Sequence, residues 1–304
     1  MTAEIISIAV AAPSGPYGRH LPAATAFVAD AAAHLRAVAH AVGARLTELG
    51  GGTATIAAVS AAIRAAAERL RAAPAGLFVL SYAGHGGRVQ DTSADELDGY
   101  DEAWALDDAP LIDDTLTGLL GSFHRDVHIV VISNCCYSGG MVDDSAGRFR
   151  SARAEGIATD LMASADGVVG RWALDSSDEH GPAPVPAATN RIVIASCGDH
   201  QMMVLPDSSR LTMRVLEVVF PIDGDGRRRQ AVDYTVVEAQ VGGMASVSQT
   251  PVVLASGADK QRQAFLAQAL ILGEAAKRPS EPRSASQDAA SESRSASQEA
   301  APTA

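Results

Sequence analysis

The stretch "GLFVLSYAGHGG", residues 76–87, decides how the chain folds. Its first eight residues are almost all apolar, and the run then stops at a single histidine between glycines, His85. A short, continuous apolar run bounded by glycine is typical of a strand that is buried on both faces, as in a parallel sheet. A second run of this kind, "VHIVVISNCCYSGG" at 127–140, ends in a pair of cysteines.

Strands and helices alternate along the rest of the sequence. Further apolar runs predict buried strands, at residues 4–11, 191–196 and 250–256. Apolar residues at helical spacing predict helices, at residues 21–46, 53–73, 112–124, 208–220, 234–247 and about 258–277. The polar, acidic segment 88–110 is expected to be a loop. This order predicts an α/β fold with a mostly parallel sheet flanked by helices on both faces.

His85 and Cys136 each follow one of the two apolar runs directly. The carboxyl ends of parallel strands host the chemistry of such sheets, so both residues are expected at one edge, side by side if their strands are neighbours. A thiol is a strong nucleophile only as a thiolate, and a nearby imidazole makes that form available. Taken singly, a buried cysteine is commonly a core residue and a histidine between glycines a turn residue. Their shared position after buried strands favours catalysis.

Composition limits the class of protein. The chain has 304 residues and a net charge of −12, so no basic surface is expected for nucleic acid. It has only three cysteines, two of them adjacent, which excludes a disulfide framework and fits a reducing compartment. The N-terminus lacks the basic residues of a signal peptide, and no apolar run reaches the ~18 residues of a membrane span. We expect a cytoplasmic monomer without an organic cofactor or membrane contact.

The two glycine-flanked stretches together resemble a known family. "YAGHGG" (82–87) and "SNCCYSGG" (133–140) are similar to the Y-S-G-H-G-G and D-x-C-H-S-G patterns of metacaspases and orthocaspases, here of bacterial type. These belong to the caspase-like cysteine peptidases, clan CD, peptidase family C14. "ASCGDHQMM" (195–203) resembles the start of the small-subunit region of that family. The resemblance implies a caspase–hemoglobinase-like fold and an endopeptidase that cuts proteins or peptides after Arg or Lys.

The resemblance also divides the chain into regions. Residues 1–143 would be the large-subunit-like (p20) region, and residues 191–277 the small-subunit-like (p10) region. Between them, the polar segment 144–190 is expected to be a mobile connection whose arginines make it a candidate for self-processing; a basic surface loop is the alternative. The tail 278–304 has no large apolar residue and is expected to be disordered.

Position by position, the resemblance makes Cys136 the nucleophile, acting through a thioacyl-enzyme, and His85 the general base. Cys136 lies immediately before "YSGG", where the family has its catalytic cysteine, so Cys135 would be a buried neighbour. The backbone amides of Gly86 and Cys136 would form the oxyanion hole.

The substrate pocket departs from the family pattern. The family has an aspartate two residues before the cysteine, where this chain has Asn134, and a serine two residues before the histidine, where it has Ala83. A second pocket acid of the family matches Asp30 in "AFVADA" (26–31), although a helix residue facing solvent is the alternative. One carboxylate is enough to favour Arg or Lys.

Acidic residues are concentrated between positions 91 and 114. On its own, such a run is usually a solvated loop, and the spacing does not match an EF-hand. Calcium-dependent members of the family have aspartates at positions that match four of this chain, Asp101, Asp113, Asp114 and Asp143. Calcium binds hard oxygen ligands of this kind, so an activating Ca²⁺ is expected.

Two other functions compete with the endopeptidase. Asn134 and Ala83 favour a catalytically idle, caspase-like scaffold that binds partners. A metal-dependent hydrolase built on His85 is the weaker alternative, because the histidines lack metal-ligand spacing.

Overall fold

The computed structural model describes residues 2–11, 22–72, 76–91, 99–139, 141, 171–172, 190–197, 214, 217, 241, 243 and 251–256. The connection 144–190, apart from 171–172, lies outside the described residues, as does the tail 278–304. The helices expected at 208–220, 234–247 and about 258–277 also lie outside them, apart from the helical residues 214, 217 and 241.

The core of the protein is a six-stranded sheet in the order β10-β9-β7-β3-β1-β2. Its strands are β1 (Ala3–Val10), β2 (Arg45–Gly50), β3 (Leu77–Gly84), β7 (His128–Asn134), β9 (Asn190–Ala195) and β10 (Val252–Ser256). All neighbouring pairs are parallel except β9 with β10. The expected mostly parallel sheet is therefore confirmed, and the strands that precede His85 and Cys136 are direct neighbours.

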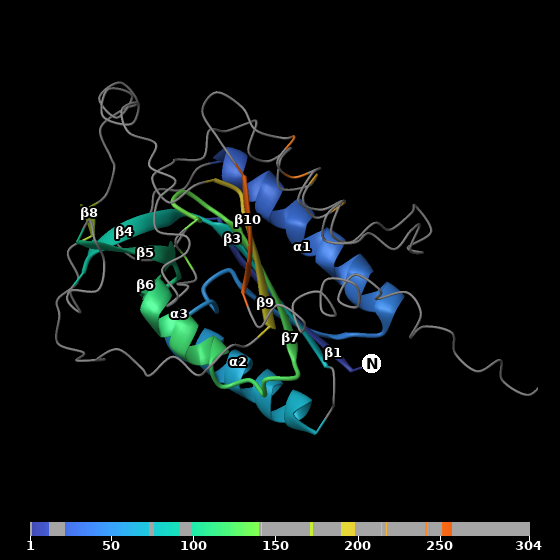
Figure 1. Cartoon of the computed structure of the whole chain (residues 1–304). Helices are drawn as coiled ribbons and strands as arrows, with labels where there is room; N and C mark the ends of the chain where they lie inside the picture. Colours follow the sequence, from blue (N-terminus) through green and yellow to red (C-terminus); the bar gives the residue numbers. More distant parts are fainter. Residues whose placement is uncertain are drawn as a thin grey trace, which may run out of the picture.

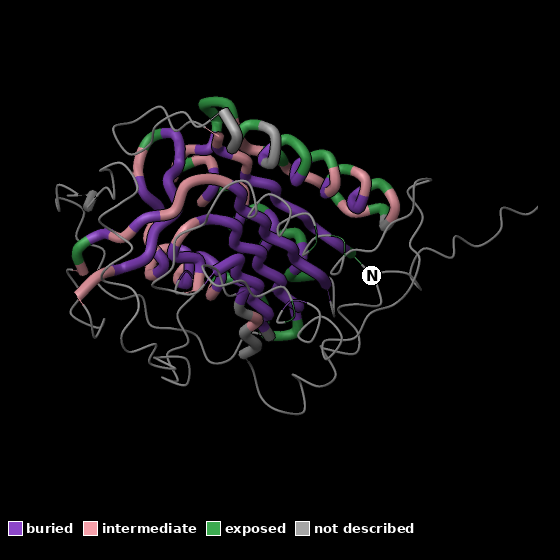
Figure 2. The backbone as a smooth tube through the Cα atoms, turned by 90° about the horizontal axis from the view of Figure 1, so that it is seen from above, coloured by how far each residue is buried: buried purple, intermediate pink, exposed green. Residues whose placement is uncertain are grey.

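Helices cover both faces of this sheet (Figure 1). Helix α1 (Pro22–Val42) lies on one face, and helices α2 (Ile56–Arg71) and α3 (Asp113–Leu120) lie on the other. The inward residues of α2 recur every three or four positions, namely Val59, Ile63, Ala66, Ala67 and Leu70. Figure 2 shows the resulting pattern, with buried strands at the centre and exposed positions on the outer side of α1.

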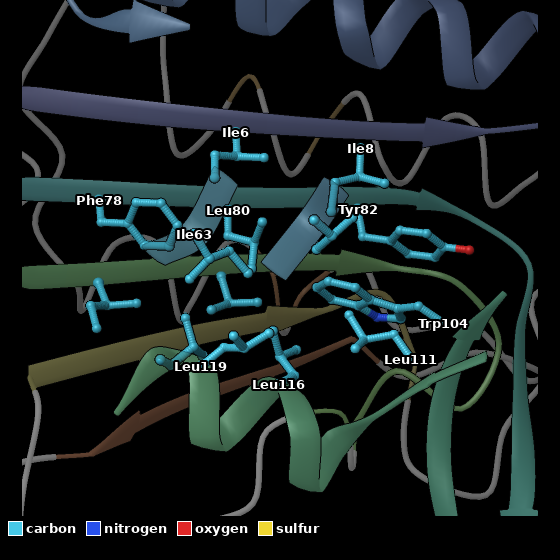
Figure 3. Packing of buried hydrophobic residues seen from close by; sticks show 14 of the residues in the cluster. Ile6, Ile8, Ile63, Phe78, Leu80, Tyr82, Trp104, Leu111, Leu116 and Leu119 are labelled. Carbon is cyan, nitrogen blue, oxygen red and sulfur yellow. The ribbon is translucent and has the colours of Figure 1, made fainter. Parts of the chain in front are cut away.

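Alternation along β3 divides the apolar side chains between the two faces. Phe78, Leu80 and Tyr82 belong to the cluster that packs on α2 and α3 (Figure 3), whereas Ala83 points to the α1 face. Each large side chain that is fully buried in this way stabilises the fold by about 1.5–3 kcal/mol. Trp104 closes the cluster at the carboxyl ends of the strands.

The start of α2 is held by side chains from two parts of the chain. Thr55 caps the helix and accepts a hydrogen bond from the Ala58 N–H at 3.1 Å. Asp108 accepts from the Ile56 N–H at 3.0 Å, and Asp107 accepts from the Ala54 N–H at 2.8 Å. Asp108 therefore satisfies an N–H that a helix start leaves without a partner, and Asp107 holds the residue before the cap.

The expected loop at 88–110 is wrong in part, because this region forms a second sheet in the order β6-β5-β4-β8. Its strands are β4 (Gly86–Gln90), β5 (Tyr100–Ala105), β6 (Pro110–Ile112) and β8 (Arg171–Trp172). Strand β5 was not recognised because it buries charged side chains, which hide the apolar alternation. The helix expected at 21–46 ends at Val42, and the chain turns through Gly43 (φ 66°) into edge strand β2.

Candidate active site

Strand register places His85 and Cys136 at equivalent positions. The last register pair of the neighbouring strands β3 and β7 is Ala83 with Asn134. His85 lies two residues beyond Ala83, and Cys136 lies two residues beyond Asn134. Because neighbouring strands are about 4.8 Å apart, the chain delivers both residues to one edge of the sheet.

Gly86 brings the two segments into direct contact. A Cβ added at Gly86 would overlap the carbonyl oxygen of Cys136 and would lie 2.9 Å from Cys135 Sγ. Only a residue without a side chain permits so close an approach of two backbones. The residue after His85 therefore packs against the backbone of Cys136 itself.

The environments of the two adjacent cysteines are different. Cys135 is completely buried, and this burial raises the pKa of its thiol well above the usual range. Its Sγ lies 3.5 Å from Ser133 Oγ, inside the cluster under α2 and α3. Cys136 is half-buried, so it is the more exposed residue of the pair. A reactive cysteine needs an accessible thiolate, and this requirement favours Cys136.

The turn that carries Cys136 is fastened to the segment after β9. The Cys197 N–H donates to Ser138 Oγ at 3.0 Å, and Ser138 Oγ donates to the Cys197 carbonyl at 3.1 Å. Cys197 Sγ lies 3.2 Å from the Cys135 carbonyl oxygen, which accepts this contact. Within the turn, Tyr137 has a φ of 56°, a left-handed conformation that is uncommon for a bulky residue. Strained backbone of this kind is concentrated at functional sites.

The backbone of His85 is held by hydrogen bonds from strands β5 and β3. Its carbonyl oxygen accepts hydrogen bonds from the Ala105 N–H at 3.0 Å and from the Tyr82 hydroxyl at 2.7 Å. The ring of Tyr82 stacks on Trp104, with centroids 4.6 Å apart and planes 7° from parallel. Sequence reasoning missed both aromatic residues, although Tyr82 is an aromatic hydroxyl inside an otherwise apolar run.

The N–H of Gly86 points away from strand β5. Hydrogen-bonded and non-hydrogen-bonded pairs alternate along an antiparallel ladder. Since the Ala105 N–H donates to the His85 carbonyl, the next pair, Gly86 with Trp104, is of the non-hydrogen-bonded kind. The Gly86 N–H is thus directed to the other side of β4.

The three residues expected to bind substrate do not all come together. Ala83 and Asn134 face each other as a register pair. Asn134 is 2% exposed, and within the described part of the chain neither atom of its side-chain amide has a hydrogen-bond partner. A buried amide of this kind costs free energy unless a ligand or water satisfies it. Asp30, in contrast, lies on the exposed side of α1.

Three of the four aspartates expected to bind calcium are described. Asp101 on β5 and Asp113 at the start of α3 are buried, and Asp114 is half-buried. Strands β5 and β6 pair Ala103 with Ile112, so these aspartates lie within two residues of one register pair. Asp143 lies outside the described residues. Within the described ranges, no three side chains of the His, Cys, Asp or Glu type gather closely enough to hold a metal ion.

No helix in the described part of the chain is long and apolar enough to cross a membrane.

Comparisons with known proteins match part of this chain to one family. Residues 52–145 match the model of the metacaspase, peptidase C14 domain. Metacaspase-6 of Arabidopsis thaliana is 41% identical over 71 residues, which is 23% of this chain and 19% of that protein. The chain thus spans less than two thirds of the length of this curated relative.

A comparison with solved structures gives further matches. Protein GSU0716 from Geobacter sulfurreducens is 26% identical with a TM-score of 0.55, over 88% of this chain and 97% of that one. Caspase-1 from Spodoptera frugiperda is 14% identical with a TM-score of 0.43, over 83% of this chain and 86% of that one.

Proposed function

Because this chain is a caspase-like member of the C14 peptidase family, we propose that it is a cysteine endopeptidase with Cys136 as nucleophile and His85 as general base. The observation that carries the proposal is the contact of Gly86, next to His85, with the backbone of Cys136. The half-buried Cys136 beside a fully buried Cys135 supports the choice of nucleophile.

The proposed reaction has two stages. His85 takes the proton of the Cys136 thiol, and the thiolate attacks the carbonyl carbon of the peptide bond. The backbone N–H groups of Gly86 and Cys136 are proposed to stabilise the resulting oxyanion, and removing one such donor typically costs about 10²–10³ in rate. His85 returns the proton to the leaving amine, which leaves a thioacyl-enzyme. Water, deprotonated by His85, then releases the carboxylic acid and restores the thiol.

We propose cleavage after Arg or Lys as the specificity of this site. Its support is the acidic character of the chain, with a net charge of −12, which attracts cationic peptides. Asn134 offers an amide oxygen as acceptor but no charge. We therefore expect weaker discrimination between Arg and an uncharged side chain such as Gln than a carboxylate would give.

Calcium activation is also proposed. The support is that Asp101 and Asp113 are buried carboxylates at one end of the β5–β6 pair, where a bound cation would offset the cost of their burial. Bound Ca²⁺ would supply positive charge that orders the rim of the site, with Asp114 and Asp143 as the further ligands. Calorimetric titration of Ca²⁺ should give binding that is weakened in Asp101→Asn and unchanged in Asp126→Asn, an exposed control. Absence of heat in the wild type would reject it.

Self-processing in the segment 144–190 is a further part of the proposal. Arg171 of β8 pairs with Arg88 of β4, three residues beyond His85, which supports access of this segment to the site. Incubation with Ca²⁺ should convert the wild type, but not Cys136→Ala, into two fragments. A single intact band for the wild type after long incubation would argue against cleavage in cis.

Fluorogenic peptides ending in Arg, Lys or Gln test the main proposal. Turnover should be lost in Cys136→Ala and in His85→Ala, and should persist in Cys135→Ala. Turnover that survives Cys136→Ala would reject the proposed nucleophile. If the wild type cleaves none of a broad peptide library, with or without Ca²⁺, the neutral pair Ala83 and Asn134 favours the scaffold that binds partners without cleaving them.

A further inference from the structure

Arg88 connects the two segments of the candidate site. It lies on β4, the strand that begins directly after His85, and faces Glu102 of β5 as its register partner. Its Nε donates to Glu102 Oε1 at 3.3 Å, and the two side chains are 23% and 6% exposed. The guanidinium is therefore mostly buried and fixed in direction by a buried carboxylate.

The guanidinium also lies over two aromatic rings. Its Cζ is 5.1 Å from the ring centroid of Tyr100 and 5.9 Å from that of Tyr137. Both distances are within the ~6 Å at which a cation is attracted to an aromatic face. Tyr100 belongs to β5, whereas Tyr137 belongs to the turn directly after Cys136. One side chain thus joins the strand after His85 to the residue after Cys136.

Tyr137 is held in an unfavourable state that needs support from its surroundings. It has a left-handed φ of 56°, and its buried hydroxyl has no hydrogen-bond partner in the described part of the chain. Burial raises the pKa of the Tyr137 phenol, the nearby Cys136 raises it further, and Arg88 acts in the opposite direction. Arg88 Cζ lies 5.9 Å from the centroid of the Tyr137 ring, and Cys136 is the preceding residue, so both groups lie close to this phenol.

We propose that Arg88 is a positioning residue, which holds the left-handed Tyr137 and thereby fixes the turn that presents Cys136 opposite the His85 segment. The inference rests on the proposed role of Cys136 as nucleophile. Lysine at this position keeps the charge but loses the planar face and the Nε–H that donates to Glu102. The Arg88→Lys variant therefore distinguishes an effect of positioning from an effect of charge alone.

Alkylation of Cys136 by iodoacetamide, followed by mass spectrometry without any substrate, tests the inference independently of peptidase activity. Arg88→Met should slow the alkylation of Cys136 by about tenfold near neutral pH and move its pH profile upward, because a displaced turn takes the thiol away from the His85 imidazole that favours the thiolate. Arg88→Lys should give an intermediate rate. The matched control is Arg36→Met, which removes an exposed ion pair with Glu48 and should leave the rate unchanged.

The route through Tyr137 is tested by a double-mutant cycle. If Arg88 acts by holding Tyr137, then Tyr137→Leu slows alkylation as well, and Arg88→Met adds little further loss in that background. Fully additive effects, or an unchanged rate in Arg88→Met, would overturn the inference. If Arg88→Met fails to fold, as judged by thermal unfolding, Arg88→Lys replaces it in the same cycle with Tyr137→Leu.

Peptide turnover separates this inference from the proposed function. In an active enzyme, Arg88→Met should lower kcat by about tenfold with little change in KM, because an interaction that positions the nucleophile acts on the chemical step. If the wild type cleaves no peptide but Arg88→Met is alkylated more slowly than the wild type, the positioning role is supported and the peptidase is rejected. If Arg88→Met is alkylated at the normal rate and peptides are still cleaved, the positioning role is rejected and the peptidase is supported.

Discussion

Replacement of Gly86 by alanine adds one methyl group where the segment after His85 contacts the backbone of Cys136. The new Cβ would overlap the Cys136 carbonyl oxygen and lie 2.9 Å from Cys135 Sγ, whereas ordinary contact begins at 3.4 Å. To reach ordinary contact, the Sγ atom alone needs a shift of about 0.5 Å (3.4 minus 2.9), and the overlap with the carbonyl needs more. Because the main obstacle is backbone, rotation of a side chain cannot relieve it.

The expected loss has two parts. Forcing a group into a packed site costs about 1–3 kcal/mol of stability. A displacement of about 1 Å between reacting groups costs about 10²-fold in rate. We therefore expect Gly86→Ala to lower kcat/KM by about 100-fold, well beyond the fraction of protein that unfolds.

Gly50→Ala is the matched control for this experiment. A Cβ at Gly50 would overlap the carbonyl oxygen of Ala9, so the steric conflict is again with backbone. Gly50 ends β2, which β1 and β3 separate from β7. Urea unfolding should show similar destabilisation for both variants, and fluorogenic peptide assays should show a specific activity of Gly50→Ala within about twofold of the wild type. Equal activity losses in the two variants, or an active Gly86→Ala, would refute the reasoning.

Three further predictions concern stability and the support of the site. Tyr82→Phe removes the hydroxyl that donates to the His85 carbonyl, which keeps its bond from the Ala105 N–H, and should cost about 0.5–1.5 kcal/mol in urea unfolding. Peptide turnover should also be slower, and unchanged values in both assays would contradict that role. Arg69→Ala should lower the free energy of unfolding by about 2 kcal/mol, because it leaves the buried Glu4 carboxylate without its two-point ion pair. The control Arg36→Ala removes an exposed ion pair and should lower it by less than about 1 kcal/mol. Burial lowers the pKa of His128 below 6.5, against the weaker opposing effect of Asp126. The unfolded chain therefore binds a proton that the folded chain does not, so the contribution of His128 is complete above the unfolded pKa and declines as pH falls through 6.5 toward the folded pKa. Thermal unfolding from about pH 7.5 to about pH 5.5 should show this decline in the wild type and less of it in His128→Gln; equal pH dependence would exclude His128 as the cause.

Much of the central sheet was predictable because its strands are short, apolar and buried on both faces. The runs at 76–83 and 127–135 carry that signal directly, and the abrupt glycines after them located the candidate site. Edge strand β2 is half-exposed and lacks an apolar face, so its sequence merged with the helix before it. The spacing of apolar residues reflects which positions are buried, so it does not reveal a strand that is only partly buried.

The supporting interactions of the site depend on contacts between distant residues. Asp107 and Asp108 bond backbone groups more than 50 residues away, and no local pattern distinguishes them from the other acids of the same run. Strand β5 buries Asp101 and Glu102, which local rules assign to solvent. The position of Arg88 over Tyr137 likewise follows from register and strand order, which periodicity does not encode.

Covalent labelling with a peptide-like electrophile, such as an arginine chloromethylketone, tests the central claim most directly. Peptide mapping by mass spectrometry should find one adduct, on Cys136, and none on the fully buried Cys135 or Cys197. Labelling should fall sharply in His85→Ala and vanish in Cys136→Ala. An adduct on Cys135, or labelling of Cys136 that does not depend on His85, would contradict a dyad of these two residues.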